Sequence, residues 1–290
     1  MEIAVPGVTV GHWTDIDART GCTVVRLPAQ TVASGEVRGG APATREFELL
    51  DPTRMVPHID AVLLTGGSAF GLAAADGVIE HLVAEDRGFP TAHGPVPIVI
   101  GLGLYDLGVG DGSVRPDARA GAAAAADAST TPTTGPVGAG AGAMVGKWLD
   151  PAAARPSGIG IVSVRRGELA VTVVLANNAA GDIADGSTEA AVIDGTFAGI
   201  PARDGYASEN TVIGVVTTNA ALDKVGCRVV AEGAHDGLAR AITPPHMRSD
   251  GDAFVAAATG DVEAPVDEVR LLTVVAVEQA VRESVGSIEG

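Results

Sequence analysis

Short runs of β-branched and other apolar residues, separated by polar turns, recur along the chain and predict strands. The first half predicts strands at 7–13, 22–27 and 61–64. The second half predicts a hairpin at 158–164 and 169–176, and a further buried strand at 212–217. The apolar runs are interrupted well before the length that a membrane-spanning helix needs, so no membrane segment is expected.

Helical periodicity alternates with these strands. Helices are expected at about 72–85, 118–128 and 222–240. The tail at 267–283 is strand-like over 269–276 and then helical. Residues 179–210 are polar and lack periodicity, which predicts a long loop that is either mobile or functional.

Composition narrows the class of protein. The 290 residues are 46% hydrophobic but only 3% aromatic, so the core must consist of aliphatic side chains, and the 39 glycines indicate closely approaching backbones. A net charge of −17 argues against nucleic-acid binding and anionic membranes. Cys22 and Cys227 form neither a metal motif nor a disulfide framework, and the N-terminus does not resemble a signal peptide, which together favour a cytoplasmic protein.

Thr211 is the first candidate for chemistry, because it lies where a polar, turn-rich stretch ending at Asn210 becomes a rigid strand. A threonine hydroxyl is a weak nucleophile unless a base stands beside it. The residue's own α-amine, with an ordinary pKa of about 7.7–8.0, can serve if the Asn210–Thr211 bond is cut. The commoner interpretation of such a residue is simply the start of a strand.

A glycine-rich turn containing Gly66, Gly67 and Ser68 joins a predicted strand to a predicted helix. Its backbone N–H groups suit an anion, an oxyanion or a substrate pocket. Glycines that permit close helix–sheet packing are an equally good interpretation. The spacing is neither that of a P-loop nor that of a dinucleotide fingerprint.

Further polar residues could contribute to an active site. Tyr105 could donate to an oxyanion or lie at a core edge, and Asn177 could be an oxyanion donor or a turn residue. Asp250 and Asp252 either face the same way on extended backbone or cap a helix. His235 and His246 stand alone in the sequence and are interpreted as structural, and no motif indicates a catalytic metal or a cofactor.

Several motifs, in this order, resemble those of the self-processing L-aminopeptidase/D-esterase family, which includes the β-peptidyl aminopeptidases. They are Pro6-Gly-Val-Thr-Val-Gly-His12, Val37-Arg-Gly-Gly-Ala-Pro42, Leu64-Thr-Gly-Gly-Ser-Ala-Phe-Gly-Leu72, Gly110-Asp-Gly-Ser-Val-Arg-Pro-Asp117, the stretch 140–147, Asn210-Thr-Val-Ile-Gly-Val-Val216, Ala234-His-Asp-Gly-Leu-Ala-Arg240 and Asp250-Gly-Asp252. The resemblance runs nearly end to end. Each motif alone is weak, and their combination is specific.

The resemblance implies an α+β fold, a four-layer αββα sandwich, made by a single domain over 1–290. It implies self-cleavage between Asn210 and Thr211 into an α-chain of residues 1–210 and a β-chain of residues 211–290. Thr211 is then the nucleophile of a hydrolase that removes N-terminal residues from small peptides or amides.

The resemblance also assigns supporting roles. Asn177 matches the oxyanion-hole asparagine, Tyr105 a tyrosine lining the site, and Asp250 with Asp252 the pair that orients the nucleophile. It further implies a homo-oligomer, a tetramer in the family.

The chain departs from the better-known members at three points. They use serine where Thr211 stands, and they also use serine where Asp250 stands. Here Asp250 and Asp252 are two residues apart, and two carboxylates that lie so close resist double ionisation. No carboxylate lies between Arg87 and Tyr105, where β-peptidyl members bind the substrate amine. Two alternatives therefore stay open: an acyltransferase resembling ornithine acetyltransferase, and a non-enzymatic scaffold that never cleaves itself.

Overall fold

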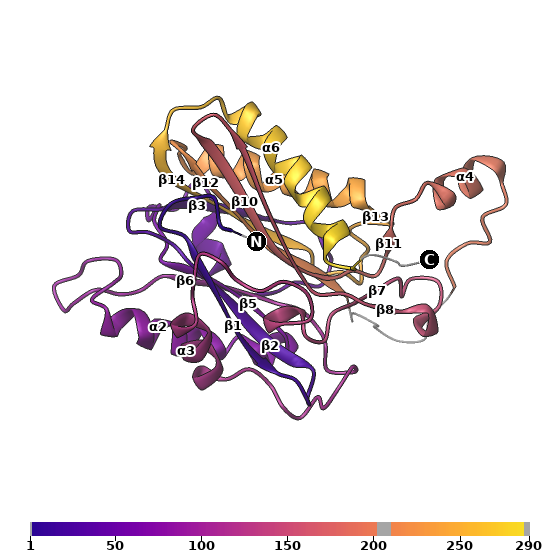
Figure 1. Ribbon diagram of the computed structural model, residues 1–290, viewed down its shortest axis with the longest axis horizontal. Helices are drawn as coiled ribbons and strands as arrows, with labels where there is room; N and C mark the ends of the chain where they lie inside the picture. The colour runs from indigo at the N-terminus through magenta and orange to yellow at the C-terminus, as the bar shows by residue number, and fades with distance from the viewer. Residues whose placement is uncertain (1, 202–209, 287–290) are drawn as a thin grey trace.

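The computed structural model describes residues 2–201 and 210–286, and within them the long strands form two five-stranded sheets (Figure 1). The first sheet has the order β1 (Thr9–Asp15), β2 (Thr20–Arg26), β5 (Ala61–Thr65), β6 (Val99–Gly103) and β4 (Ala43–Arg45). The second has the order β3 (Val32–Val37), β14 (Ala253–Val262), β12 (Thr211–Ala220), β10 (Leu169–Asn178) and β9 (Ile159–Arg166). Both are mixed: β5–β6 and β12–β14 are parallel, and the other pairs are antiparallel.

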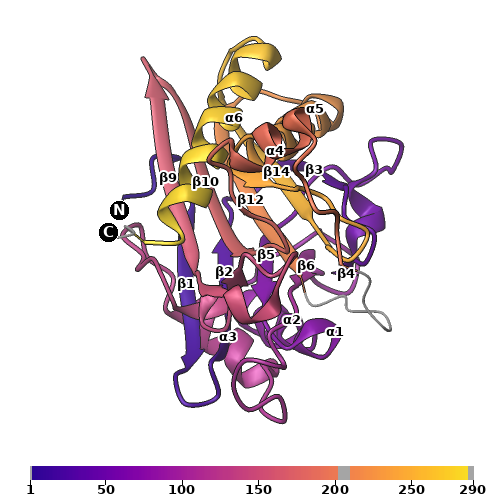
Figure 2. The same cartoon turned by 90° about the vertical axis from the view of Figure 1, so that its right-hand side faces the viewer.

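Helices cover the outer faces of both sheets. The first sheet carries α2 (Ala74–Ala84) and α3 (Ala118–Ala126), and the second carries α5 (Lys224–Ala241) and α6 (Val266–Glu283) (Figures 1 and 2). The remaining elements are short and lie in the connections. They are α1 (Ser68–Gly71), α4 (Ser187–Asp194), the 3₁₀ turns Phe47–Leu50, Gly138–Gly140 and Pro151–Ala153, and the two-residue strands β7 (Met144–Val145), β8 (Arg155–Pro156), β11 (Asp182–Ile183) and β13 (Ile242–Thr243).

The hydrophobic core is divided by the sheets. One cluster lies between them, with residues such as Leu64, Leu102 and Val215; a second joins the second sheet to α5 and α6, and a third joins the first sheet to α2 and α3. Small residues allow this close packing: a Cβ on Gly121 of α3 would lie 1.8 Å from the Ala74 carbonyl oxygen of α2. The glycine- and alanine-rich composition thus permits backbones to approach where bulky aromatic residues are scarce.

Most predicted elements are confirmed within a few residues. The strands predicted at 61–64, 158–164, 169–176 and 212–217 correspond to β5, β9, β10 and β12, and the predicted helices to α2, α3 and α5. Both cysteines are buried and free, in different clusters. Among the described residues, no helix combines the length and apolarity needed to cross a bilayer.

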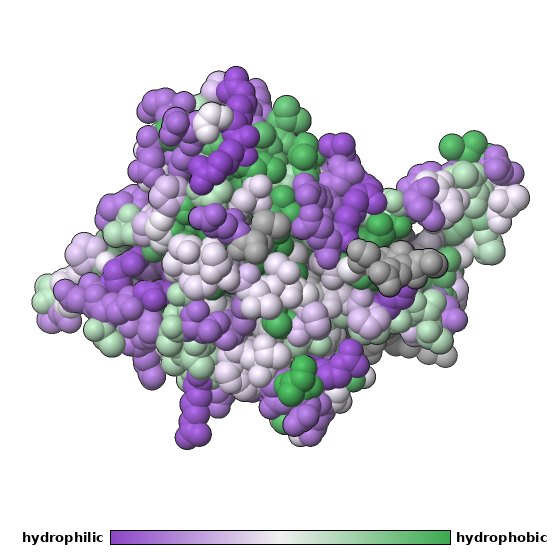
Figure 3. Space-filling view, in the orientation of Figure 1, coloured by the Kyte–Doolittle hydropathy of each residue, from purple (hydrophilic) through white to green (hydrophobic). Residues whose placement is uncertain are grey.

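Two predictions of secondary structure are wrong. Residues 269–276, expected as a strand, lie inside α6, where Val269, Thr273, Ala276 and Val277 form one buried face at helical spacing. The expected loop at 179–210 contains β11 and α4, although its part at 202–209 lies outside the described residues. The α4 helix has no buried residue and projects from the body, with apolar residues at its tip (Figures 1 and 3).

Candidate active site

The register of β10 and β12 determines which polar side chains share a face. Thr211 lies opposite Asn178, and Val212 lies opposite Asn177. Successive residues of a strand point to opposite faces. Ile213 packs between the sheets, whereas Val212 packs under α5 and α6. Thr211 and Asn178 therefore face the space between the sheets, and Asn177 faces the outer helices.

Thr211 is the first residue of β12, as predicted, and it is buried. Its hydroxyl donates a hydrogen bond to the carbonyl oxygen of Asn210, the residue before it. The Gly251 N–H donates to that same oxygen over 3.1 Å. A Cβ at residue 251 would lie 2.9 Å from the Thr211 Oγ1 and 2.7 Å from the Ala41 carbonyl oxygen, so only glycine fits there without displacing a neighbour. The 210–211 peptide carbonyl is thus held between a hydroxyl and a backbone donor.

Asp252 fixes the start of β12. Its Oδ1 accepts the Val212 N–H at 2.7 Å, and its Oδ2 lies 2.8 Å from the Nδ1 of His246. The pair Asp250 and Asp252 precedes β14 rather than a helix, so the interpretation as a helix cap is wrong. His246, interpreted as isolated, is a partner of this carboxylate.

Asp250 is a buried carboxyl with two backbone donors. Its Oδ1 accepts the Ala180 N–H at 3.1 Å and its Oδ2 accepts the Met247 N–H at 2.9 Å. Burial, and then the neighbouring charge of Asp252, raises the pKa of Asp250 to about 7. The two hydrogen bonds and the nearby Lys147 oppose this rise in the pKa. The expected resistance of the pair to double ionisation agrees with this shift.

The two adjacent asparagines have different partners. The Asn177 amide donates to the Ser284 Oγ of the segment after α6 at 3.0 Å, away from Thr211. The Asn178 amide nitrogen donates to the Tyr105 carbonyl oxygen at 2.9 Å, and its Oδ1 accepts the Met144 N–H at 3.0 Å. The asparagine that shares a face with Thr211 is therefore Asn178 and not Asn177, the residue singled out from the sequence.

Lys147 also belongs to this group, although the sequence marks it only as the last residue of the motif at 140–147. Its Nζ donates to the Oδ1 of Asn178 at 2.9 Å and to the Asn178 carbonyl oxygen at 3.2 Å. A glycine-rich segment carries it, and no local pattern connects it with a strand end more than thirty residues downstream.

A cavity of about 330 Å³ opens beside this group. Its described lining is Arg19, Tyr105, Gly108, Val109, Met144, Lys147, Pro151, Ala154, Asn178 and Asn210. Tyr105, Asn178 and the residue before Thr211 thus share one cavity, which places the 210–211 bond at its edge. Among the described residues, no three histidine, cysteine or carboxylate side chains gather as a metal site.

The turn at Gly66, Gly67 and Ser68 is not among the described residues that line this cavity. All of its N–H groups are occupied within the chain, donating to the Gly21 carbonyl oxygen, the Asp106 carboxylate and the Leu104 carbonyl oxygen respectively. A Cβ at residue 66 would lie 2.1 Å from the Asp106 Oδ2. The geometry favours the alternative left open from the sequence, in which these glycines serve close packing.

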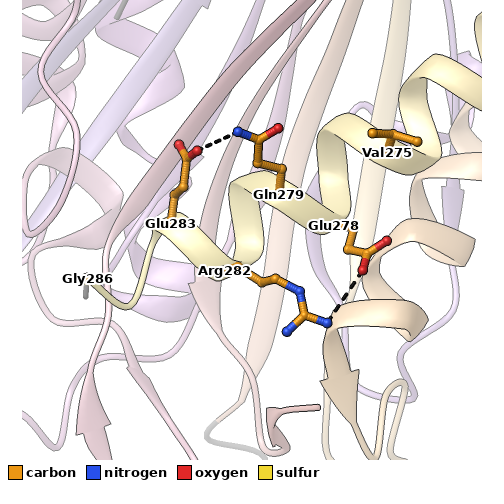
Figure 4. A pocket seen from close by; sticks show the side chains of 6 residues that line it. All are labelled: Val275, Glu278, Gln279, Arg282, Glu283 and Gly286. Atoms are coloured by element: carbon orange, nitrogen blue, oxygen red, sulfur yellow. Dashed lines mark hydrogen bonds and ion pairs between the residues drawn. The ribbon is translucent and has the colours of Figure 1, made fainter. Parts of the chain in front are cut away.

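A larger hollow lies elsewhere, along the outer face of α6 (Figure 4). Gln279 donates to Glu283, and Arg282 pairs with Glu278, so its polar side chains bond along the same helix. It contains none of the polar groups gathered around Thr211. Size alone therefore does not identify the reactive site in this molecule.

The family model described as Peptidase family S58 matches residues 3–289. The chain belongs to this family. An uncharacterized aminopeptidase of Mycobacterium leprae is 40% identical over 287 residues, covering 90% of this chain and 78% of that protein. The resemblance drawn from the sequence motifs is confirmed, and this S58 peptidase is a hydrolase.

Solved structures similar to this S58 peptidase share its fold. The PH0078 protein from Pyrococcus horikoshii OT3 has a TM-score of 0.75 at 22% identity, covering 98% of this chain and 85% of that one. The L-aminopeptidase D-Ala-esterase/amidase of Ochrobactrum anthropi, described as a variant of the Ntn hydrolase fold, has a TM-score of 0.73 at 20% identity, covering 97% and 84%. The mixed α/β fold of the chain is therefore shared with both of these proteins.

Proposed function

We propose that this S58 hydrolase cleaves itself between Asn210 and Thr211 and then removes N-terminal residues from small peptides or amides with Thr211 as nucleophile. The hydrogen bonds on the Asn210 carbonyl oxygen carry this proposal. The nucleophile lies against the bond that it must attack, and a backbone donor already contacts the oxygen on which charge develops.

In the first step the Thr211 Oγ1 attacks the Asn210 carbonyl carbon. The Gly251 N–H stabilises the resulting oxyanion. The carbon–nitrogen bond then breaks, the hydroxyl proton passes to the released Thr211 amine, and the acyl group remains on Oγ1 as an ester. Water hydrolyses this ester to the Asn210 carboxylate and the free Thr211 hydroxyl.

In the second step the freed amine of Thr211, with an ordinary pKa of about 7.7–8.0, takes the proton of its own hydroxyl. The Asn178 amide, which faces the same space, supplies an oxyanion donor. Asp252 holds the start of β12 through the Val212 N–H, and His246 orients that carboxylate. Tyr105 lines the substrate cavity.

The arrangement of cores supports an αββα sandwich as the finer description of the fold, with one cluster between the sheets and one under each helical layer. It also supports a single domain over 1–290, because both proposed products contribute strands to the second sheet. Family membership favours hydrolysis over the acyl-transfer and scaffold alternatives. The homo-oligomer and the cytoplasmic location stay predictions.

Intact mass and a denaturing gel test the proposal directly. The wild type is expected as two pieces ending and beginning at Asn210 and Thr211, and Thr211→Ala as one chain that does not hydrolyse aminoacyl p-nitroanilides. Thr217 lies on the same strand and face, where its hydroxyl donates to the Thr172 carbonyl oxygen, and Thr217→Ala is the matched control that still splits. A Thr211→Ala chain that is cut at residue 210 would refute the mechanism.

A further inference from the structure

Among the described residues, the charged side chains that line the active-site cavity are opposite in sign to the net charge of the whole chain. The sequence carries a net charge of −17. The charged side chains among the described residues lining the cavity are Arg19 and Lys147, both cations. A substrate group that enters this space therefore meets two cationic side chains among the described lining residues.

Arg19 is the cation that remains available. Lys147 is already bound to the Asn178 side chain. In contrast, no carboxylate within the described parts of the chain lies at ion-pair distance from Arg19, although most other arginines described are paired with one. Arg19 is an exposed residue, and it lines the cavity.

The backbone beneath Arg19 is firmly held. It has a φ of 53°, a left-handed conformation uncommon for a residue with a side chain. A Cβ at Gly142 would lie 2.3 Å from the Arg19 carbonyl oxygen, and one at Gly110 would lie 3.0 Å from the Arg19 Cβ. Arg19 lies in the tight turn between β1 and β2, and this packing fixes the point at which its side chain leaves the backbone.

We propose that Arg19 is a specificity-determining residue that binds a carboxylate of the substrate. This rests on the proposed function, since the cavity is then the substrate site beside Thr211. A planar guanidinium can bind a carboxylate with two parallel hydrogen bonds. The substrate class is thus a short peptide with a free carboxylate, supplied either by its C-terminus or by an acidic side chain.

Binding to the uncleaved Thr211→Ala chain tests this independently of self-cleavage and turnover. By calorimetry at low salt, alanyl-alanine is expected to bind roughly tenfold or more tightly than alanyl-alanine amide. A second pair, alanyl-glutamate amide against alanyl-glutamine amide, reports on a side-chain carboxylate instead. A preference in one pair identifies the source of the carboxylate.

Arg19→Ala is expected to abolish the preference, Arg19→Lys to retain part of it, and Arg19→Glu to reverse it. Arg54→Ala is the matched control, because Arg54 is exposed, pairs with Glu48 and lies outside the cavity lining. Equal binding of acid and amide in both pairs, or a preference that survives Arg19→Ala, would overturn the proposal.

Kinetics of the self-cleaved enzyme show whether Arg19 binds a carboxylate of the substrate or one of the protein itself. Cleavage creates a new carboxylate on Asn210, which also lines the cavity. If the substrate is the occupant, the ratio of kcat/KM for acid over amide shows the same preference and falls in Arg19→Ala. A preference present in Thr211→Ala but absent from the mature enzyme means that Asn210 occupies the site, and it overturns the assignment to substrate.

Discussion

Replacement of Asp250 by asparagine tests the electrostatics of the site most directly. We make Asp250→Asn in the Thr211→Ala background so that the chain stays intact. The free energy of unfolding of this variant is expected to fall less than that of its parent as the pH rises toward neutrality. Burial, followed by the charge of Asp252, raises the pKa of Asp250 from 3.8 to about 7 in the folded chain. The folded protein therefore keeps this proton at a pH where the unfolded chain has lost it.

The sign and size of the effect follow from that difference. Because protonation favours the folded state, the contribution of Asp250 to stability falls as the pH rises from about 4 to about 7 and is level above that. The whole shift corresponds to about 4 kcal/mol. About 2–3 kcal/mol of it falls between pH 5 and pH 8. Asparagine has one acceptor oxygen, so the Ala180 or Met247 N–H loses its partner at a cost of about 1–3 kcal/mol that does not depend on pH.

Urea unfolding at several pH values separates the two contributions. The free energy of unfolding of the asparagine variant, relative to its parent, is expected to rise by about 2–3 kcal/mol from pH 5 to pH 8. Asp194→Asn, at the exposed end of α4, is the matched control for the change from aspartate to asparagine itself. A difference between variant and parent at Asp250 that stays constant with pH would refute the raised pKa and the account of the carboxylate pair.

Two further substitutions test the geometry. Asn178→Ala is expected to lower kcat by roughly 10²–10³. Asn177→Ala, which removes a bond to Ser284, is expected to lower kcat less than about tenfold. If steady-state kinetics give the reverse order, Asn177 is the oxyanion donor, as expected from the sequence. Gly251→Ala is expected to slow self-cleavage at least about tenfold, because the new Cβ meets the Thr211 hydroxyl and the Ala41 carbonyl oxygen. A time course on denaturing gels checks this against Gly226→Ala, on α5 and outside the cavity lining, where the nearest atom to a new Cβ is the Leu222 Cβ at 3.2 Å, and equal rates would contradict it.

The start of β12 was predictable from the sequence. Which of the two adjacent asparagines shares a face with Thr211 was not. β-branched residues after a polar stretch mark the loop-to-strand boundary at Thr211 locally. In β10, however, all ten residues are buried, because one face meets the other sheet and one meets the helices. No alternation of polar and apolar residues then reveals which face Asn177 or Asn178 takes.

The hydrogen-bond partners of Lys147 and His246 could not be predicted from the sequence either. Lys147 reaches Asn178, 31 positions downstream, only after the fold brings together segments with no local signature. His246 and Asp252 are only six residues apart, but the irregular loop between them has no periodicity that would place their side chains together. The strand expected inside α6 failed differently. Its β-branched residues favour extended backbone locally, but packing of one helical face against the second sheet and α5 overrides that preference.

The order of the second sheet limits what the proposed cut can separate. In β3-β14-β12-β10-β9, the two strands that follow residue 210 are flanked on both sides by strands that precede it. Releasing either product would break ladder hydrogen bonds along a strand on each side and expose two cores to water. Scission therefore yields two polypeptides that stay interlocked: they should elute together from a native column and part only in denaturant, so the new amine is gained without loss of the fold that holds it.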